Sequence, residues 1–397
     1  MHKTMKQSSV MKTYNRFPIN LVKGKGSYVW DDEGKKYLDF TAGIGTCNLG
    51  HLPDKVQTKV KEQLDLLWHC SNLYGIENQE ELASLLTEHS KMDKVFFCNS
   101  GAEANEAAIK IAKKYAKDQG NVERTEIVTF KQSFHGRTGV TMAATAQEKI
   151  HKGFTPLTPG FRYLPLNDFH ILDEIHNGKT TAVLLELVQG EGGVHPADVQ
   201  WIKELEKICK KNDILLMIDE VQTGIGRTGT LFAYEQYEIK PDVITLAKGL
   251  GSGLPIGAML ATEEVAESFQ AGTHGSTFGG NPLVASAGIA TIQTIIEDNI
   301  LENVKEISSK LKVGLEKLKQ QHSIFKAVRM RGLLVGMELD EEVSPWITKF
   351  REKGILVLSA GANVLRILPP LTVTDEEIEN FLYTFQELLE ETEEVVS

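Results

Sequence analysis

Two predicted strands of this sequence each lead into a charged residue, and the two charged residues could perform chemistry together. The aliphatic run Ile214 to Ile218 is followed by Asp219, and the β-branched run Asp242 to Ala247 is followed by Lys248. Both runs predict strands that are buried on two faces of a parallel sheet. Because ligands of open α/β sheets bind at the carboxyl ends of the strands, we expect the two side chains to face one site.

The chemistry of this pair indicates a pyridine cofactor. A buried carboxylate needs a cationic or hydrogen-bonding partner, and a protonated pyridine nitrogen would serve Asp219. A lysine in a partly desolvated pocket becomes a nucleophilic amine that can form a Schiff base, as Lys248 would. A single Asp or Lys at a strand end is more often a solvated residue or a salt-bridge partner. The pair, with glycines after both strands, favours pyridoxal phosphate (PLP).

The segments Asp219-Glu220-Val221-Gln222-Thr223-Gly224 and Ala247-Lys248-Gly249, at this spacing, resemble the signature of class III PLP-dependent aminotransferases. The resemblance implies that Lys248 carries the cofactor, that Asp219 pairs with its pyridine nitrogen and that Gln222 lies near the ring hydroxyl. Glu220 and Val221 complete this cofactor-binding segment. The implied fold is α/β, PLP-dependent transferase fold type I. It has a large domain with a mostly parallel seven-stranded sheet and a smaller α+β domain.

Length and element order divide the chain further. We expect residues 1–50 to form an N-terminal segment of the small domain. Residues 51–285 are expected to form the large PLP-binding domain, and residues 286–397 the C-terminal small domain.

A predicted phosphate site precedes the central strands. Val95 to Cys98 is a strand, and a helix opens directly after Asn99. A strand, a Ser-Gly turn and a helix N-terminus bind phosphate through free amide groups and the helix dipole. A simple capping turn on Ser100 or Asn99 is equally consistent with the residues. The resemblance implies that Ser100, Gly101 and Ala102 bind the cofactor phosphate.

Two further loops could contact the cofactor and substrate. On their own, Phe134 would more often be a core residue and Arg137 a surface ion-pair partner. The segment Ser133 to Thr138 resembles the family's Phe-His-Gly-Arg loop, which implies that Phe134 stacks on the ring and Arg137 binds a substrate carboxylate. The loop Gly275 to Pro282 resembles one that reaches the neighbouring subunit's site. Thr277 would contact the phosphate there, and Ser276 the substrate, so a homodimer with active sites at the subunit interface is implied.

Arg366 lies in the otherwise apolar predicted strand Val364 to Leu368 and needs a carboxylate partner. The acceptor 2-oxoglutarate has two carboxylates, which Arg137 and Arg366 can bind. The resemblance implies that Glu191 pairs with Arg366 while an ω-amino donor is bound, hiding a charge that this donor would leave unpaired. Leu187 stands where the family usually has proline.

Nearly the whole chain follows the pattern of acetylornithine aminotransferases, and Ser71 to Tyr74 and Leu358 to Gly361 favour this member. The implied reaction moves the δ-amino group of N2-acetyl-L-ornithine to 2-oxoglutarate and yields N-acetyl-L-glutamate 5-semialdehyde and L-glutamate, in arginine biosynthesis. Ornithine δ-aminotransferase, succinylornithine aminotransferase and 4-aminobutyrate aminotransferase share the catalytic residues and are the alternatives. Gly75 replaces the bulkier residue that the pattern predicts.

Two other classes of protein were weighed. Gly224 to Gly229 spells a dinucleotide fingerprint, but that motif should pass from a strand directly into a helix, and Asp219 would repel a pyrophosphate. A catalytically silent PLP-fold protein is the other alternative. The presence of Lys248, Asp219, Arg137 and Glu191 argues against it.

Composition excludes several partners. The 397 residues include 43 basic and 54 acidic side chains, and the net charge of −11 argues against nucleic-acid or anionic-membrane binding. The four cysteines have no paired spacing, so neither a disulfide framework nor a metal site is predicted, and a cytoplasmic location fits. The first thirty residues are basic, including Lys3 and Lys6, which makes a transit peptide conceivable. Asn15 to Asn20, however, already resembles the start of the family's fold.

Overall fold

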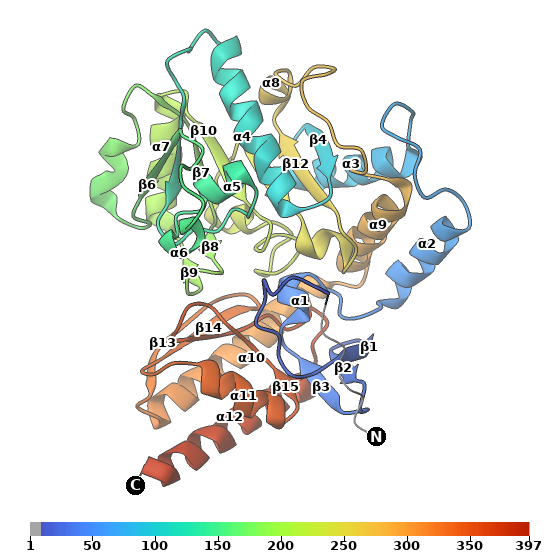
Figure 1. Cartoon of the computed structure of the whole chain (residues 1–397), viewed down its shortest axis with the longest axis vertical. Helices are drawn as coiled ribbons and strands as arrows, with labels where there is room; N and C mark the ends of the chain where they lie inside the picture. Colours follow the sequence, from blue (N-terminus) through green and yellow to red (C-terminus); the bar gives the residue numbers. More distant parts are fainter. Residues whose placement is uncertain (1–8, 397) are drawn as a thin grey trace.

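The computed structural model describes residues 9–396, so Lys3 and Lys6 of the basic N-terminal segment lie outside the described residues. Two units are stacked on each other (Figure 1). The larger one surrounds a seven-stranded sheet, and the smaller one combines the N-terminal strands with the C-terminal part of the chain.

The seven-stranded sheet has the order β4-β12-β11-β10-β7-β5-β6. Only β12 runs antiparallel to its two neighbours, so the predicted mostly parallel seven-stranded sheet is confirmed. The strands are β4 (Lys94–Cys98), β5 (Glu126–Phe130), β6 (Phe161–Leu164), β7 (Thr180–Leu185), β10 (Leu215–Asp219), β11 (Val243–Leu246) and β12 (Gly257–Ala261).

Both faces of this sheet are covered, which explains why its central strands are apolar without alternation. One face packs on α4, whose alanine-rich side allows a close approach. The other face packs on α3, α7 and α9 in the largest core of the molecule. The helices of this unit are α2 (Asp54–Leu64), α3 (Glu77–Ser90), α4 (Gly101–Asp118), α7 (Val199–Lys211) and α9 (Pro282–Glu297).

The two strands predicted around the charged pair are β10 and β11, and they are parallel neighbours. Asp219 is paired with Thr245 in this register, one residue before the end of β11. Lys248 follows two residues after the end of β11. The sheet therefore brings Asp219 and Lys248 to the same edge, as expected for strands whose carboxyl ends meet.

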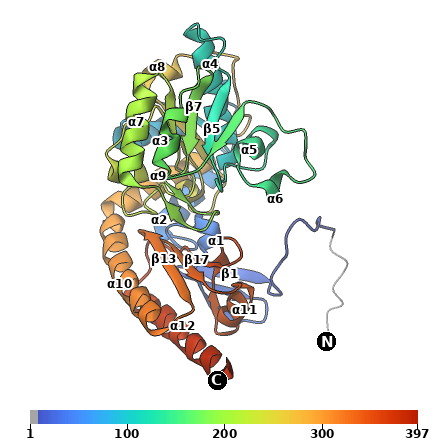
Figure 2. The ribbon, with the colours of Figure 1, turned by 90° about the vertical axis from the view of Figure 1, so that its left-hand side faces the viewer.

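The small unit contains two four-stranded sheets. In the first, β15 joins the N-terminal hairpin of β2 and β3, and β1 extends it on the other side. In the second, the order is β13-β14-β17-β16, and α10 and α12 pack beside it (Figure 2). The elements are β1 (Leu21–Lys25), β2 (Tyr28–Asp31), β3 (Lys36–Asp39), α10 (Ile300–Gln321), β13 (Phe325–Arg331), β14 (Leu334–Leu339), α11 (Ser344–Glu352), β15 (Ile355–Leu356), β16 (Leu358–Ser359), β17 (Val364–Ile367) and α12 (Asp375–Val396).

The packing locates the junction between the units. Helix α9 belongs to the large core as far as Ile295, whereas α10 enters the small core at Val304. Leu38 and Phe40, from the N-terminal segment, lie in this same small core. We infer that the division falls between α9 and α10, because a boundary after residue 285 would cut α9.

The glycine-rich segment after β10 does not have the context of a dinucleotide fingerprint. Gly224 to Gly229 forms consecutive turns and is not followed by an α-helix, and Arg227 within it is fully buried. Among the described residues, no helix is long and apolar enough to cross a membrane. The remaining short elements are α1 (Ala42–Gly45), α5 (Gly139–Ala144), α6 (Glu148–His151), η1 (Phe169–Glu174), β8 (Val188–Gln189), β9 (His195–Pro196), η2 (Ala233–Tyr237), η3 (Lys248–Gly251) and α8 (Glu263–Ala266).

Candidate active site

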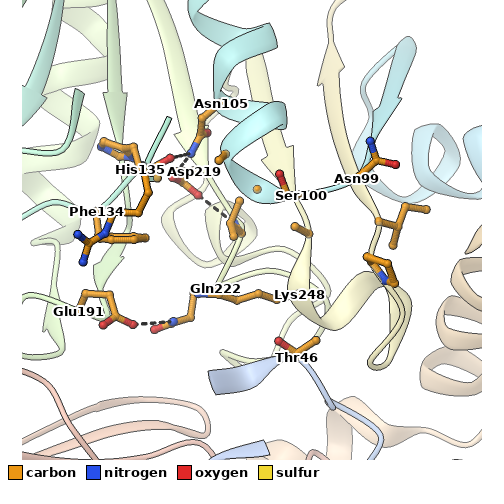
Figure 3. Close-up of a pocket in the computed structure, with 18 of the residues that line it drawn as sticks. Thr46, Asn99, Ser100, Asn105, Phe134, His135, Glu191, Asp219, Gln222 and Lys248 are labelled. Carbon is orange, nitrogen blue, oxygen red and sulfur yellow. Dashed lines mark hydrogen bonds and ion pairs between the residues drawn. The ribbon is translucent and has the colours of Figure 1, made fainter. Parts of the chain in front are cut away.

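A cavity of about 470 Å³ lies at the carboxyl ends of the central strands, between the two units (Figure 3). It is large enough for a small cofactor together with a substrate. Most of the residues predicted from the sequence line it, namely Ser100, Gly101, Ala102, Phe134, Arg137, Glu191, Asp219, Val221, Gln222 and Lys248. Thr46, from the N-terminal segment, and Pro255, from the turn before β12, also line it.

Lys248 begins η3 with φ at +40°, a left-handed conformation that residues other than glycine rarely adopt. Its ammonium group has no hydrogen-bond partner among the described residues. Burial lowers the pKa of Lys248, although the carboxylates of Glu191, Asp219 and Glu186 oppose that effect. A buried lysine without a fixed partner is suited to act as a nucleophilic amine.

Asp219 is the last residue of β10 and is almost fully buried. Its Oδ2 accepts hydrogen bonds from Asn105 Nδ2 at 2.8 Å and from His135 Nδ1 at 2.8 Å. Its Oδ1 accepts from the Val221 amide at 3.0 Å. Thr245 fixes the Asn105 side chain by donating to its Oδ1 at 2.8 Å. The carboxylate is thus held by three donors in one orientation at the edge of the cavity.

Asn105 and His135 were not predicted as site residues. Asn105 is a polar residue on the alanine-rich face of α4, and His135 is the histidine of the Phe-His-Gly-Arg segment. A buried polar residue on an apolar helix face was the only signal for the first. The partner that each side chain meets depends on the packing of α4 and the loop after β5 against β10.

The N-terminus of α4 presents free amide groups to the cavity. Ser100 is the N-cap, and its hydroxyl accepts from the Glu103 amide at 3.2 Å. The amides of Gly101 and Ala102 donate to no other described residue. A Cβ at position 101 would lie 2.6 Å from a methyl group of Val221, so only glycine fits there. Amides at the positive end of an 18-residue helix suit a phosphate.

The loop after β5 carries Phe134 and Arg137. Phe134 is half-buried and faces the cavity (Figure 3), and its backbone amide donates to Glu186 Oε1 at 2.7 Å. The guanidinium carbon of Arg137 lies 5.7 Å from the centroid of the Phe134 ring. Arg137 is exposed and can therefore meet an anionic substrate at the rim of the cavity.

Arg366 of β17, in the small unit, has a carboxylate partner that lines the cavity. Its guanidinium group donates to Glu191 Oε1 at 2.6 Å and to the Gly190 carbonyl at 2.9 Å. Burial by itself would raise the pKa of Glu191, but Arg366 outweighs this effect and the net shift is downward. Gln222 lies beside the pair, with Nε2 at 3.5 Å from Glu191 Oε1.

Four of the predicted residues do not line the cavity, namely Arg366, Glu220, Ser276 and Thr277. Glu220 is turned into the protein, where Thr223 Oγ1 donates to its carboxylate at 2.5 Å and the Tyr234 amide at 2.9 Å. It therefore supports the turn after Asp219 and does not face a cofactor. Ser276 and Thr277 lie in the neighbouring loop, where the Ser276 hydroxyl accepts from Asn99 Nδ2 at 3.2 Å.

The model of the family described as aminotransferase class-III matches residues 9–389. The chain belongs to the class-III aminotransferases. An acetylornithine aminotransferase from Oceanobacillus iheyensis is 64% identical over 97% of this chain and 96% of its own length. One from Caldanaerobacter subterraneus is 51% identical over 98% of this chain and 99% of its own.

Solved structures of class-III aminotransferases share the fold. An ornithine aminotransferase from Toxoplasma gondii superposes with a TM-score of 0.94 at 30% identity, covering 97% of this chain and 93% of its own. An N-acetylornithine aminotransferase from Stenotrophomonas maltophilia gives a TM-score of 0.82 at 38% identity, with 94% of this chain and 95% of its own covered. The predicted fold class is confirmed.

Enzymes of this family depend on PLP, so this chain is a PLP-dependent aminotransferase. The cavity fits the cofactor at both of its ends. Free amides at the start of α4 match a phosphate, and the amine of Lys248, free of any described partner, matches an aldehyde. Asp219, held as an acceptor by three donors, matches a protonated ring nitrogen.

Proposed function

We propose that this class-III aminotransferase transfers the δ-amino group of N2-acetyl-L-ornithine to 2-oxoglutarate. The products are N-acetyl-L-glutamate 5-semialdehyde and L-glutamate, a step of arginine biosynthesis. The observation that carries the chemistry is the pair Arg366 and Glu191, 2.6 Å apart, because Glu191 lines the same cavity as Lys248. The choice of substrate is supported by the names of full-length relatives that are 50 to 64% identical.

The residues in the cavity divide the work of holding PLP. Ser100, Gly101 and Ala102 are proposed to bind its phosphate, and Phe134 and Val221 to sandwich its ring. Gln222 approaches the ring hydroxyl and Asp219 the ring nitrogen. When bound, the cofactor supplies an aldehyde that accepts the amino group and a ring that withdraws electrons from the substrate carbon.

Lys248 then acts as the general base and acid. With the cofactor bound, its Nζ would take the proton from the substrate carbon that bears the amino group and would return it within the same half-reaction. Burial lowers the pKa of Lys248, which favours the neutral amine that this transfer needs. Asp219 keeps the ring nitrogen protonated, because its carboxylate is fixed as an acceptor in a buried position.

Substrate selection is assigned to two arginines and one glutamate. Arg137 binds the α-carboxylate of either substrate. Arg366 binds the second carboxylate of 2-oxoglutarate once Glu191 has moved away, and Glu191 returns to Arg366 when the amine donor is bound. The exchange avoids leaving a buried guanidinium group unpaired in either half-reaction.

We further propose a cytoplasmic homodimer whose partners are these small molecules and not nucleic acid or membrane. Ser276 and Thr277 are assigned to the site of the other subunit, Ser276 near the substrate and Thr277 on the phosphate. The exposed aromatic Phe278 beside them supports an interface. The four cysteines are unpaired, which suits a reducing compartment.

A single-turnover experiment tests the substrate assignment. Purified holoenzyme is mixed with N-acetylornithine or with ornithine, without a keto acid, and the absorbance of the cofactor is followed. We expect N-acetylornithine to convert the cofactor to its amine form much faster than ornithine does. Faster conversion by ornithine would reassign the enzyme as an ornithine aminotransferase, the function named for the superposed Toxoplasma gondii structure. Absence of any lysine-bound cofactor would contradict the role of Lys248.

A further inference from the structure

Three carboxyl groups line the cavity, and they differ in what compensates them. Glu191 is paired with Arg366 at 2.6 Å. Asp219 accepts hydrogen bonds from two side chains and one amide. Glu186 accepts one hydrogen bond, from the backbone amide of Phe134 at 2.7 Å. Within residues 9–396, no lysine, arginine or histidine forms an ion pair with Glu186.

Glu186 directly follows the end of β7, next to β10, and only 6% of its surface is exposed. Its ionised form would place a second negative charge in the cavity beside Asp219. Burial and Asp219 raise the pKa of Glu186 well above its usual value, and Glu191 acts in the same direction. The Phe134 amide and Lys248 act in the opposite direction but do not cancel the effect.

Apart from the ammonium group of Lys248, whose opposing effect does not cancel the shift, the charged groups of the site do not compensate Glu186. His135 is bound to Asp219, and the guanidinium group of Arg366 is bound to Glu191. Arg137 is exposed at the rim and lies against the Phe134 ring. In such surroundings the neutral form of a buried carboxyl group has a lower free energy than the ionised form, so the group retains its proton.

The hydrogen bond from the Phe134 amide allows Glu186 to hold a loop in position. Phe134 lies in the loop after β5, which also carries His135 and Arg137. The bond from the Phe134 amide to Glu186 ties this loop to the end of β7. We infer that it fixes where the Phe134 ring lies beside the cavity. Because His135 is the next residue, the same bond helps to hold the His135 imidazole against Asp219.

We propose that Glu186 is a positioning residue of the transamination site and works as a neutral carboxylic acid. Its carbonyl oxygen accepts the Phe134 amide and thereby holds the ring-stacking loop in place, while its retained proton keeps a third negative charge out of the cavity. The proposal deepens the proposed function and rests on it only for the kinetic part of the test. Ionisation of Glu186 adds a charge beside Asp219 and lowers activity.

The protonation state is tested on the apoenzyme, from which cofactor has been removed. Infrared difference spectra between the wild type and Glu186→Gln are recorded from about pH 5 to about pH 8. We expect the substitution to remove the carbonyl stretch of a protonated carboxylic acid at neutral pH. Loss of a carboxylate signal in its place would overturn the proposal, whatever reaction the holoenzyme catalyses.

Thermal unfolding of the apoenzyme gives a second readout that does not depend on activity. A carboxyl group whose folded-state pKa is raised binds more protons when folded, so its contribution to stability falls as pH rises above the unfolded-state pKa. We therefore expect the melting temperature of Glu186→Gln, relative to that of the wild type at the same pH, to increase as the pH is raised. A constant difference across the range contradicts a protonated Glu186.

Kinetics of the holoenzyme test the positioning role. Glutamine resembles the neutral acid in shape and keeps an oxygen for the Phe134 amide, so Glu186→Gln should retain kcat and KM within about twofold. Glu186→Ala removes the acceptor and should lower kcat by about tenfold, with a smaller change in KM, because the loop is displaced. The wild type should lose activity at alkaline pH where Glu186→Gln does not. Equal losses in both variants, or identical pH profiles, would refute the role.

Asp242→Asn is the matched control. The carboxyl group of Asp242 also accepts a backbone amide, that of Leu216 at 2.7 Å, but Asp242 precedes β11 and does not line the cavity. Its substitution should leave kcat within about twofold of the wild type and remove a different infrared signal. A loss of activity as large as that of Glu186→Ala would show that any buried carboxyl group here matters equally and would contradict the proposal.

Discussion

Carboxylates that line the cavity find their partners within the same chain, whereas side chains of a neighbouring loop surface are left exposed. In the cavity, the carboxylates of Asp219 and Glu191 have side-chain partners in the same chain. The loop surface, which we define as residues 65–75 and 270–280, exposes large apolar side chains instead. These include Leu66 at 77%, Trp68 at 63%, Leu73 at 88%, Tyr74 at 70% and Phe278 at 59% exposure.

The two halves of the loop surface are held together. Asn72 Nδ2 donates to the Ser276 carbonyl at 3.0 Å and to the Gly279 carbonyl at 3.2 Å, and the rings of His69 and Phe278 lie 5.1 Å apart. A fixed surface with contiguous exposed apolar groups is typical of a protein interface. One chain therefore supplies the nucleophile Lys248 and the residues around it. We interpret the loop surface as the part of the chain that binds a second subunit and reaches its active site.

Of the changes to the cavity, removal of the Lys248 amine should have the largest effect on turnover. Lys248→Ala deletes the one lysine amine among the described residues that line the cavity, so we expect turnover to fall on the order of 10³-fold or more. The expected oligomeric state is unchanged. Steady-state assays with N-acetylornithine and light scattering check both, and appreciable remaining turnover would contradict the assignment of Lys248.

The loop surface is tested by placing charge on it. Trp68→Asp combined with Phe278→Asp puts two carboxylates on side chains that are exposed in one chain, so folding should be preserved. We expect the protein to become monomeric and activity to fall by roughly 10²-fold, because Thr277 no longer reaches the second site. Sedimentation and activity measured on the same sample check this prediction. The exposed Tyr383→Asp on α12 is the control, and it should remain dimeric.

A smaller effect is expected from Glu191, which acts as a gate by leaving Arg366 in one half-reaction and pairing with it in the other. Glu191→Ala leaves Arg366 buried without its carboxylate when the amine donor is bound. We expect the half-reaction with N-acetylornithine to slow by about tenfold, while the half-reaction with glutamate changes less. Separate single-turnover measurements of the two half-reactions check the asymmetry, and equal losses would argue against a gate.

Residue patterns predicted the elements whose burial is uniform or strongly periodic. The aliphatic runs of β10 and β11 have one interpretation, because strands covered on both faces are apolar throughout. Strand β13 was not predicted, since three basic residues interrupt its apolar ones without a regular alternation along FKAVRMR. Strand β12, with the sequence GAMLA, was also missed because small residues bounded by glycine give little β propensity.

The sequence by itself determined that Asp219 and Lys248 stand at the ends of two strands of one sheet. This follows from local hydrophobicity and strand order, which act over a few residues. Only the tertiary structure decided which polar groups meet. Asn105 and His135 converge on Asp219, and Arg366 pairs with Glu191, 175 positions away, a pairing that the family resemblance implies but no local pattern gives. Such partners depend on how α4, β17 and the loops pack against the sheet, and that packing reflects the burial of whole faces, which no local pattern encodes.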